Sequence, residues 1–150
     1  MMDRIELKNA GEALKEKEQI EVLTSGRSME PLFKEHRDIA VVSRVEKPLK
    51  KGDIVLYSRD EKNFILHRIV KIKGENLIIR GDNNLNFERD IKADRIIGVL
   101  IALYRKGKYM TAKDIPFKAF AVFSKIRYPF IYVYRKLRHF LWKKLKQKDN

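Results

Sequence analysis

Short runs of apolar residues, separated by turn residues, make up the middle of the chain. Runs that are rich in β-branched side chains and bounded by glycine, asparagine or aspartate are typical of antiparallel strands. The runs cover residues 20–23, 39–45, 54–57, 64–72, 77–79, 96–104 and 108–110. We therefore predict a mainly β fold, an antiparallel β-barrel or sandwich, for this part of the chain.

The two ends of the chain have a helical pattern instead. Residues 3–18 are rich in helix-forming residues, but their apolar stripe is thin, which predicts a short and marginal helix. Asp114 followed by Pro116 has the pattern of a helix start, after which apolar residues recur every three or four positions. Pro129 is expected to kink or restart this second helix. The predicted organisation is an N-terminal helical segment (1–19), a β-domain (20–113) and a basic, aromatic-rich helical tail (114–150).

The tail carries most of the net charge of +14. Residues 116–150 contain ten basic residues against one acid, Asp149, whereas residues 1–115 contain 24 basic and 19 acidic residues. A basic amphipathic helix with many aromatic residues suits an anionic membrane surface, and we expect residues 116–148 to contact one. A helix packed on the β-domain with a solvated basic edge is an equal alternative. No nucleic-acid partner is expected, because no nucleic-acid-binding motif accompanies the basic residues.

Neither end of the chain is expected to cross a membrane. The first 24 residues contain no apolar run, so neither a signal peptide nor an N-terminal anchor is predicted. Within residues 115–134, Lys125 and Arg127 together oppose insertion by roughly 5–7 kcal/mol. We expect a peripheral, membrane-associated protein that is otherwise cytoplasmic. The absence of cysteine removes disulfides and thiolate metal sites, and we expect neither a metal nor another cofactor.

Short polar motifs between and within the predicted strands contain candidate catalytic groups. Ser28 lies in a turn at residues 26–31, from which a hydroxyl could attack a carbonyl carbon. His67 lies on the predicted inward face of an apolar strand, where an imidazole could act as a base. Asp82 and Asp90 are later carboxylates that could orient the ring. Taken singly, these residues have ordinary interpretations: a turn serine, a satisfied core histidine, a hairpin aspartate and a solvated loop charge.

Together the motifs resemble those of the signal peptidase and LexA-type serine peptidases, and most of all the endoplasmic reticulum and archaeal type of signal peptidase I. The resemblance extends from about Val22 to Tyr109. It rests on Ser-Met-Glu-Pro at 28–31, Pro-Leu-Lys-Lys-Gly-Asp-Ile-Val at 48–55, His-Arg-Ile-Val at 67–70, Gly-Asp-Asn-Asn at 81–84 and Ile-Ile-Gly at 96–98. In bacterial signal peptidases and self-cleaving repressors the base is a lysine, whereas the endoplasmic reticulum type has a histidine, as this chain does.

The resemblance implies a serine endopeptidase that cleaves leader or signal peptides through an acyl-enzyme. Ser28 would be the nucleophile and His67 the general base. Asp82, or alternatively Asp90, would favour the imidazolium form of the base. The family often has a hydroxyl two residues before the nucleophile, where this chain has Gly26, so the oxyanion is expected to depend on the backbone N–H of Ser28 and a neighbour. The implied partner is a peptide or preprotein substrate.

Two further functions are compatible with the sequence. A self-cleaving regulator of the LexA type would use the same β-fold on its own chain, but it needs a DNA-binding module, and 24 residues are too few for a helix-turn-helix domain. A non-catalytic β-module that docks on membranes through its basic tail would retain the motifs as remnants. These alternatives differ from a peptidase in whether Ser28 is activated.

Overall fold

The computed structural model describes residues 4–6, 9–60, 63–112 and 114–146. In chain order the elements are β1 (Arg4–Glu6), α1 (Ala10–Glu16), β2 (Gln19–Leu23), β3 (Ile39–Ser43), β4 (Ile54–Asp60), β5 (Asn63–Lys73), β6 (Asn76–Arg80), β7 (Glu88–Lys92), the 3₁₀ helix η2 (Ala93–Arg95), β8 (Ile96–Arg105), β9 (Lys108–Thr111) and α2 (Ile115–Lys146).

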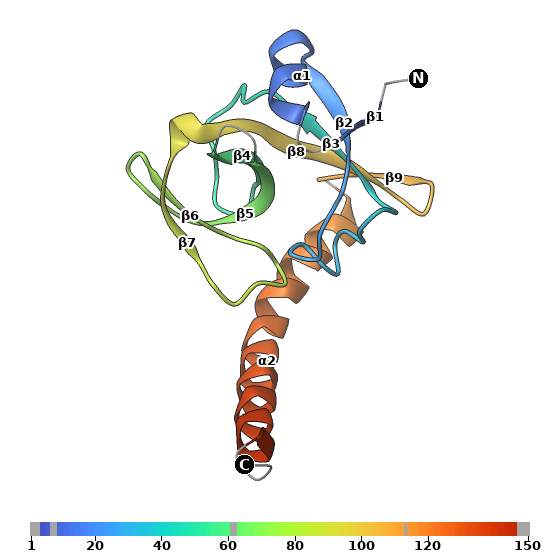
Figure 1. The fold of residues 1–150 in the computed structure, drawn as a ribbon. Helices are drawn as coiled ribbons and strands as arrows, with labels where there is room; N and C mark the ends of the chain where they lie inside the picture. Colours follow the sequence, from blue (N-terminus) through green and yellow to red (C-terminus); the bar gives the residue numbers. More distant parts are fainter. Residues whose placement is uncertain (1–3, 7–8, 61–62, 113, 147–150) are drawn as a thin grey trace.

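The nine strands of the described chain form one open sheet, which is strongly coiled in Figure 1. The strand order is β1-β2-β3-β8-β4-β5-β6-β7, and β9 pairs with β8. Only β1 and β2 run parallel, while the other pairs are antiparallel. The mainly β fold predicted from the sequence is confirmed, with a short helix near the N-terminus and one long helix near the C-terminus.

Every apolar run that was predicted to be a strand is one, but β1 and β7 were not predicted. The sequence of β7 is Glu-Arg-Asp-Ile-Lys, so four charged residues obscure the single apolar residue that packs inward, Ile91. Strand β1 lies in the segment that was predicted to be helical, and that prediction is wrong for residues 4–6. Their backbone pairs with the edge of β2 instead, and α1 retains only the part held by buried Ala10 and Leu14.

Strand β8 joins the two halves of the hydrophobic core. It pairs with β3 on one side and with β4 on the other, so that Val99 is opposite both Ser43 and Val55. Gly98 lies at this junction, because an ideal Cβ there would come within 2.5 Å of Val42 Cγ1 and 2.8 Å of the Ser43 carbonyl oxygen. The sheet can close up at this point only because residue 98 has no side chain.

Helix α2 leaves the sheet and extends away from it (Figure 1). Pro129 lies inside α2, and the helix continues through it, so the restart predicted as one possibility at Pro129 does not occur. Among the described residues, no helix has an apolar stretch that is long and hydrophobic enough to cross a bilayer. Much of the apolar surface of α2 is nevertheless exposed.

Substitution Gly98→Ala is expected to lower the free energy of unfolding by about 1–3 kcal/mol, because the added methyl group overlaps three neighbours, one of them a backbone atom that cannot rotate away. Urea denaturation followed by circular dichroism measures the change. An unchanged denaturation midpoint would show that the approach of β3 to β8 is looser than the structure has it.

Candidate active site

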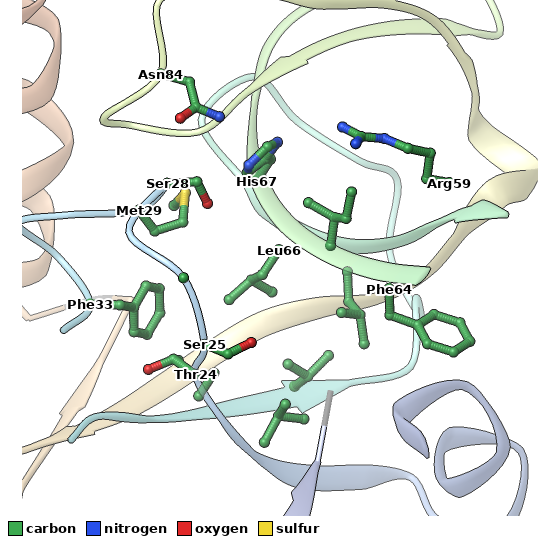
Figure 2. A pocket seen from close by; sticks show the side chains of 16 residues that line it. Thr24, Ser25, Ser28, Met29, Phe33, Arg59, Phe64, Leu66, His67 and Asn84 are labelled. Carbon is green, nitrogen blue, oxygen red and sulfur yellow. The ribbon is translucent and has the colours of Figure 1, made fainter. Parts of the chain in front are cut away.

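A cavity of about 310 Å³ lies beside the turn that contains Ser28 (Figure 2). Its apolar wall comes from strands β2 to β5 and from the turn after β2: Val22, Met29, Phe33, Ala40, Val42, Leu56, Phe64, Ile65 and Leu66. Its polar groups come from the same turn, from β4 and β5, and from the loop after β6: Thr24, Ser25, Ser28, Arg59, His67 and Asn84. The cavity therefore places a hydroxyl and an imidazole next to a mainly apolar binding surface.

His67 is buried on β5, opposite Val55 of β4. Its Nδ1 atom lies 2.8 Å from Oε1 of Glu88. Because an ionised carboxylate can only accept, Nδ1 carries the proton and Nε2 of the neutral ring has a free lone pair. Burial lowers the pKa of His67 below its ordinary value, although the nearby charge of Glu88 acts in the opposite direction. The ring is therefore neutral near pH 7 and can accept a proton at Nε2.

Glu88 is held by two further donors. The hydroxyl of Tyr57 lies 2.5 Å, and Nη2 of Arg59 2.6 Å, from its Oε2 atom. Burial acts to raise the pKa of Glu88, but these hydrogen bonds and the charge of Arg59 outweigh burial, and the pKa falls below its ordinary value. Burial and the bond to Glu88 also raise the pKa of Tyr57, so its hydroxyl stays a donor. Glu88 is an ionised carboxylate with both oxygens engaged.

A β-bulge in β7 turns Glu88 toward the histidine. Glu88 is opposite Ile79 of β6, whereas Ile91 is opposite Leu77, so β7 has one extra residue between these pairs. Asp90 lies in the bulge with a positive φ of 57° and is exposed. In a regular strand, residues three positions apart point to opposite faces, and the bulge allows both Glu88 and Ile91 to face inward.

The loop after β6 is fastened to the turn that contains the serine. The backbone N–H of Asn83 donates to the carbonyl oxygen of Ser28 at 2.7 Å, and the side-chain amide of Asn83 donates to the carbonyl oxygen of Arg27 at 3.0 Å. These bonds hold the loop after β6 against the serine turn, although the two segments are far apart in the sequence. They explain why a hairpin-like Gly-Asp-Asn-Asn motif accompanies the serine.

Gly81 lies where these groups come closest together. An ideal Cβ at Gly81 would lie 2.6 Å from the carbonyl oxygen of Ser28 and 2.9 Å from both Nε2 of His67 and Nδ2 of Asn84. Nε2 of the histidine therefore faces the serine turn across the residue that has no side chain. Figure 2 shows Ser28, His67 and Asn84 grouped at one end of the cavity.

The structure brings Ser28 and His67 together but gives Asp82 and Asp90 other surroundings. In the described part of the chain, no hydrogen bond joins the Ser28 hydroxyl to the ring, and in peptidases without substrate this bond is often long. Both oxygens of Asp82 accept from the buried guanidinium of Arg68, at 2.8 and 2.7 Å. Asp90 is exposed on the bulge.

The carboxylate that contacts the ring is Glu88, which is not among the residues predicted from the sequence. The position of Glu88 between the candidates Asp82 and Asp90 is a signal in the sequence. It is easily missed, because the sequence pattern of this segment does not show where the loop ends and the strand begins. The arrangement of a serine, a neutral histidine and an ionised carboxylate is that of a serine hydrolase.

A comparison with protein families gives the same class. The model described as Peptidase S24-like matches residues 6–101 of this chain. The chain therefore belongs to that peptidase family, and its sheet has the fold of a serine peptidase. A comparison with curated proteins found no match.

Substitution Glu88→Gln is expected to lower the pKa of His67 further, because it removes the negative charge that stabilises the imidazolium while the ring stays buried. The chemical shift of the imidazole protons, followed by NMR during a pH titration, measures this pKa. Asp90→Asn is the matched control, since it neutralises an exposed carboxylate on the same strand. An equal shift in both variants would contradict the assignment of Glu88 as the partner of the ring.

Proposed function

We propose that this protein is a serine endopeptidase that cleaves leader or signal peptides through an acyl-enzyme at a membrane surface. The observation that carries the proposal is the buried, neutral His67, with Nδ1 bonded to Glu88 and Nε2 facing the turn of Ser28. Membership of a peptidase family supports the peptidase activity. The leader-peptide substrate is supported by the resemblance of the serine, histidine and Gly-Asp-Asn-Asn motifs to signal peptidases of the endoplasmic reticulum and archaeal type.

In the proposed mechanism His67 transfers one proton in each half-reaction. Nε2 takes the proton of the Ser28 hydroxyl as the serine oxygen bonds to the carbonyl carbon of the scissile peptide. The imidazolium, stabilised by Glu88, then gives this proton to the amide nitrogen as the C–N bond breaks. Water repeats the sequence on the acyl-enzyme, which releases the carboxylic acid and restores the Ser28 hydroxyl.

Two donors are available for the oxyanion that forms on the carbonyl oxygen. Within the described residues, the backbone N–H of Ser28 donates no hydrogen bond. The side-chain amide of Asn84 also lines the cavity without a hydrogen-bond partner among those residues. Preorganised donors of this kind stabilise the charge of the tetrahedral intermediate.

The substrate's side chains are proposed to enter the apolar part of the cavity. The wall nearest the serine turn includes Met29, Phe33 and Leu66, which favour apolar side chains next to the scissile bond. The signal peptidase type, rather than a LexA-type self-cleaving regulator, is supported by the histidine base at residue 67. The basic, aromatic-rich α2 supports a membrane surface as the place of action.

Substitutions Ser28→Ala and His67→Ala are each expected to lower kcat/KM by about 10³-fold or more, because each removes one participant in proton transfer and attack. Cleavage of a set of synthetic leader-like peptides, analysed by mass spectrometry, measures the loss. Asp90→Asn should leave the rate near that of the wild type.

Retention of full activity by His67→Ala would contradict the assignment of the base. A self-cleaving regulator would instead show scission of its own chain at a rate that does not depend on protein concentration. Absence of any cleavage, together with vesicle binding, would favour the non-catalytic membrane-docking module.

The acid limb of the pH profile is expected to lie below the ordinary histidine pKa of 6.5. Catalysis needs neutral His67, and burial keeps the ring neutral at pH values where an exposed histidine is already protonated. Activity should therefore persist at pH 6.5 and fall only as the pH passes through the lowered pKa. Measurement of kcat/KM between pH 4.5 and 8 tests this, and an acid limb above 6.5 would contradict it.

A further inference from the structure

Among the described side chains of helix α2, Tyr128 contacts the loop that leads to Glu88. Its hydroxyl donates to the carbonyl oxygen of Leu85 at 3.1 Å. The guanidinium of Arg80 lies 3.9 Å from the centroid of the Tyr128 ring and 4.9 Å from that of Phe87. The Tyr128 and Phe87 rings also contact one another edge to face, with centroids 6.1 Å apart. Tyr128 therefore contacts the loop at Arg80, Leu85 and Phe87.

This loop between β6 and β7 contains residues that set the geometry of the candidate active site. It begins at Arg80 on β6, passes through Gly81 and Asn83 beside the serine turn, and ends at Glu88 on β7. The contacts of Tyr128 lie next to both ends of this loop. A change in the position of α2 would therefore change the position of Glu88, the carboxylate that orients His67.

The other side of α2 is an exposed apolar stripe. Six apolar side chains, spaced three or four residues apart and between 54% and 71% exposed, form it: Val122, Ile126, Phe130, Val133, Leu137 and Phe140. With 3.6 residues per turn these positions share one side of the helix, and Tyr128 lies roughly opposite them. The helix can therefore bind a second surface with the stripe while Tyr128 stays on the loop.

The charge of this segment favours an anionic lipid bilayer as that second surface. Residues 116–150 contain ten basic residues and one acidic residue. Basic residues outside an apolar stripe suit the interface of a bilayer, where the stripe enters the acyl boundary and the cations contact phosphate groups. A second copy of the chain would bring two strongly basic helices together, which is electrostatically unfavourable.

We propose that α2 docks on anionic membranes through this apolar stripe, and that Tyr128 transmits docking to the loop between β6 and β7. A helix fixed at the bilayer restricts the motion of Tyr128, and this lowers the free-energy cost of ordering Gly81 to Glu88 around the histidine. The lipid then acts as an activator of the peptidase. The effect on catalysis rests on the function proposed above, whereas the effect on the loop does not.

Vesicle binding tests the docking surface without reference to activity. Co-sedimentation of the protein with vesicles measures the fraction of protein that is bound. Vesicles of phosphatidylglycerol and phosphatidylcholine should bind the protein, and vesicles of pure phosphatidylcholine should not. The double substitution Ile126→Ser and Phe130→Ser, at exposed positions, should abolish this binding. Equal binding to both vesicle types, or concentration-dependent dimerisation that protects the stripe without lipid, would overturn the proposed docking.

Tyr128→Ala tests the coupling between the helix and the loop. Hydrogen exchange of residues 81–88 should slow when anionic vesicles are added to the wild type, and kcat/KM should rise roughly fivefold or more. The variant should bind vesicles as the wild type does but show neither response. Tyr128→Phe, which keeps the ring contacts, should show an intermediate response, and Tyr109→Ala, an exposed tyrosine on β9, should behave as the wild type.

The results separate the two proposals. Vesicle-dependent protection of the loop without peptide cleavage would keep the coupling and reject the peptidase function. Cleavage that is equal with and without bound vesicles, or full stimulation of Tyr128→Ala, would reject the coupling and keep the peptidase. Thermal unfolding of each variant shows whether it is folded, and loop exchange in Tyr128→Phe decides the case should Tyr128→Ala unfold.

Discussion

The hydrogen bond between Nδ1 of His67 and Oε1 of Glu88 is the interaction on which the rest of the site depends. It fixes the tautomer of the ring and directs the lone pair of Nε2 to the serine turn. Three strands supply its parts, since His67 lies on β5, Glu88 on β7, and the supporting Tyr57 and Arg59 on β4. The bond therefore exists only in the assembled sheet.

Asp82 and Glu88, near the two ends of the loop after β6, show that the hydrogen-bond partners of a carboxylate determine its role. Asp82 is buried with both oxygens on Arg68, whose Nη1 also donates to the carbonyl oxygen of Gly52. This network ties the loop to the turn before β4 and leaves Asp82 no free oxygen for the ring. Glu88 has one oxygen on its structural donors and the other on His67, so it can respond to the charge of the imidazole.

The sequence predicted the features that depend on local pattern. Strands with apolar runs, the turn at Ser28 and the inward position of His67 follow from periodicity and turn chemistry, and the structure contains them. The identity of the carboxylate beside the ring depends on a bulge in a highly charged strand, where alternation fails. Strand β1 was missed because it has only three residues, and its pairing with β2 is a tertiary contact that no local pattern predicts. The roles of Ser28, His67, Asp82 and Asp90 in catalysis stay predictions.

The position of β8 in the sheet limits when the protein can fold during its synthesis. Strands β3 and β4 follow one another in the sequence, yet β8 lies between them in the sheet. Among the described elements, β8 is the tenth to be synthesised. The serine turn belongs to the half of the sheet before this seam, and the histidine to the half after it. A nascent polypeptide that has not yet emerged beyond Arg105 cannot join the two halves, because β8 ends at this residue. The candidate active site can thus form only after β8 has been synthesised.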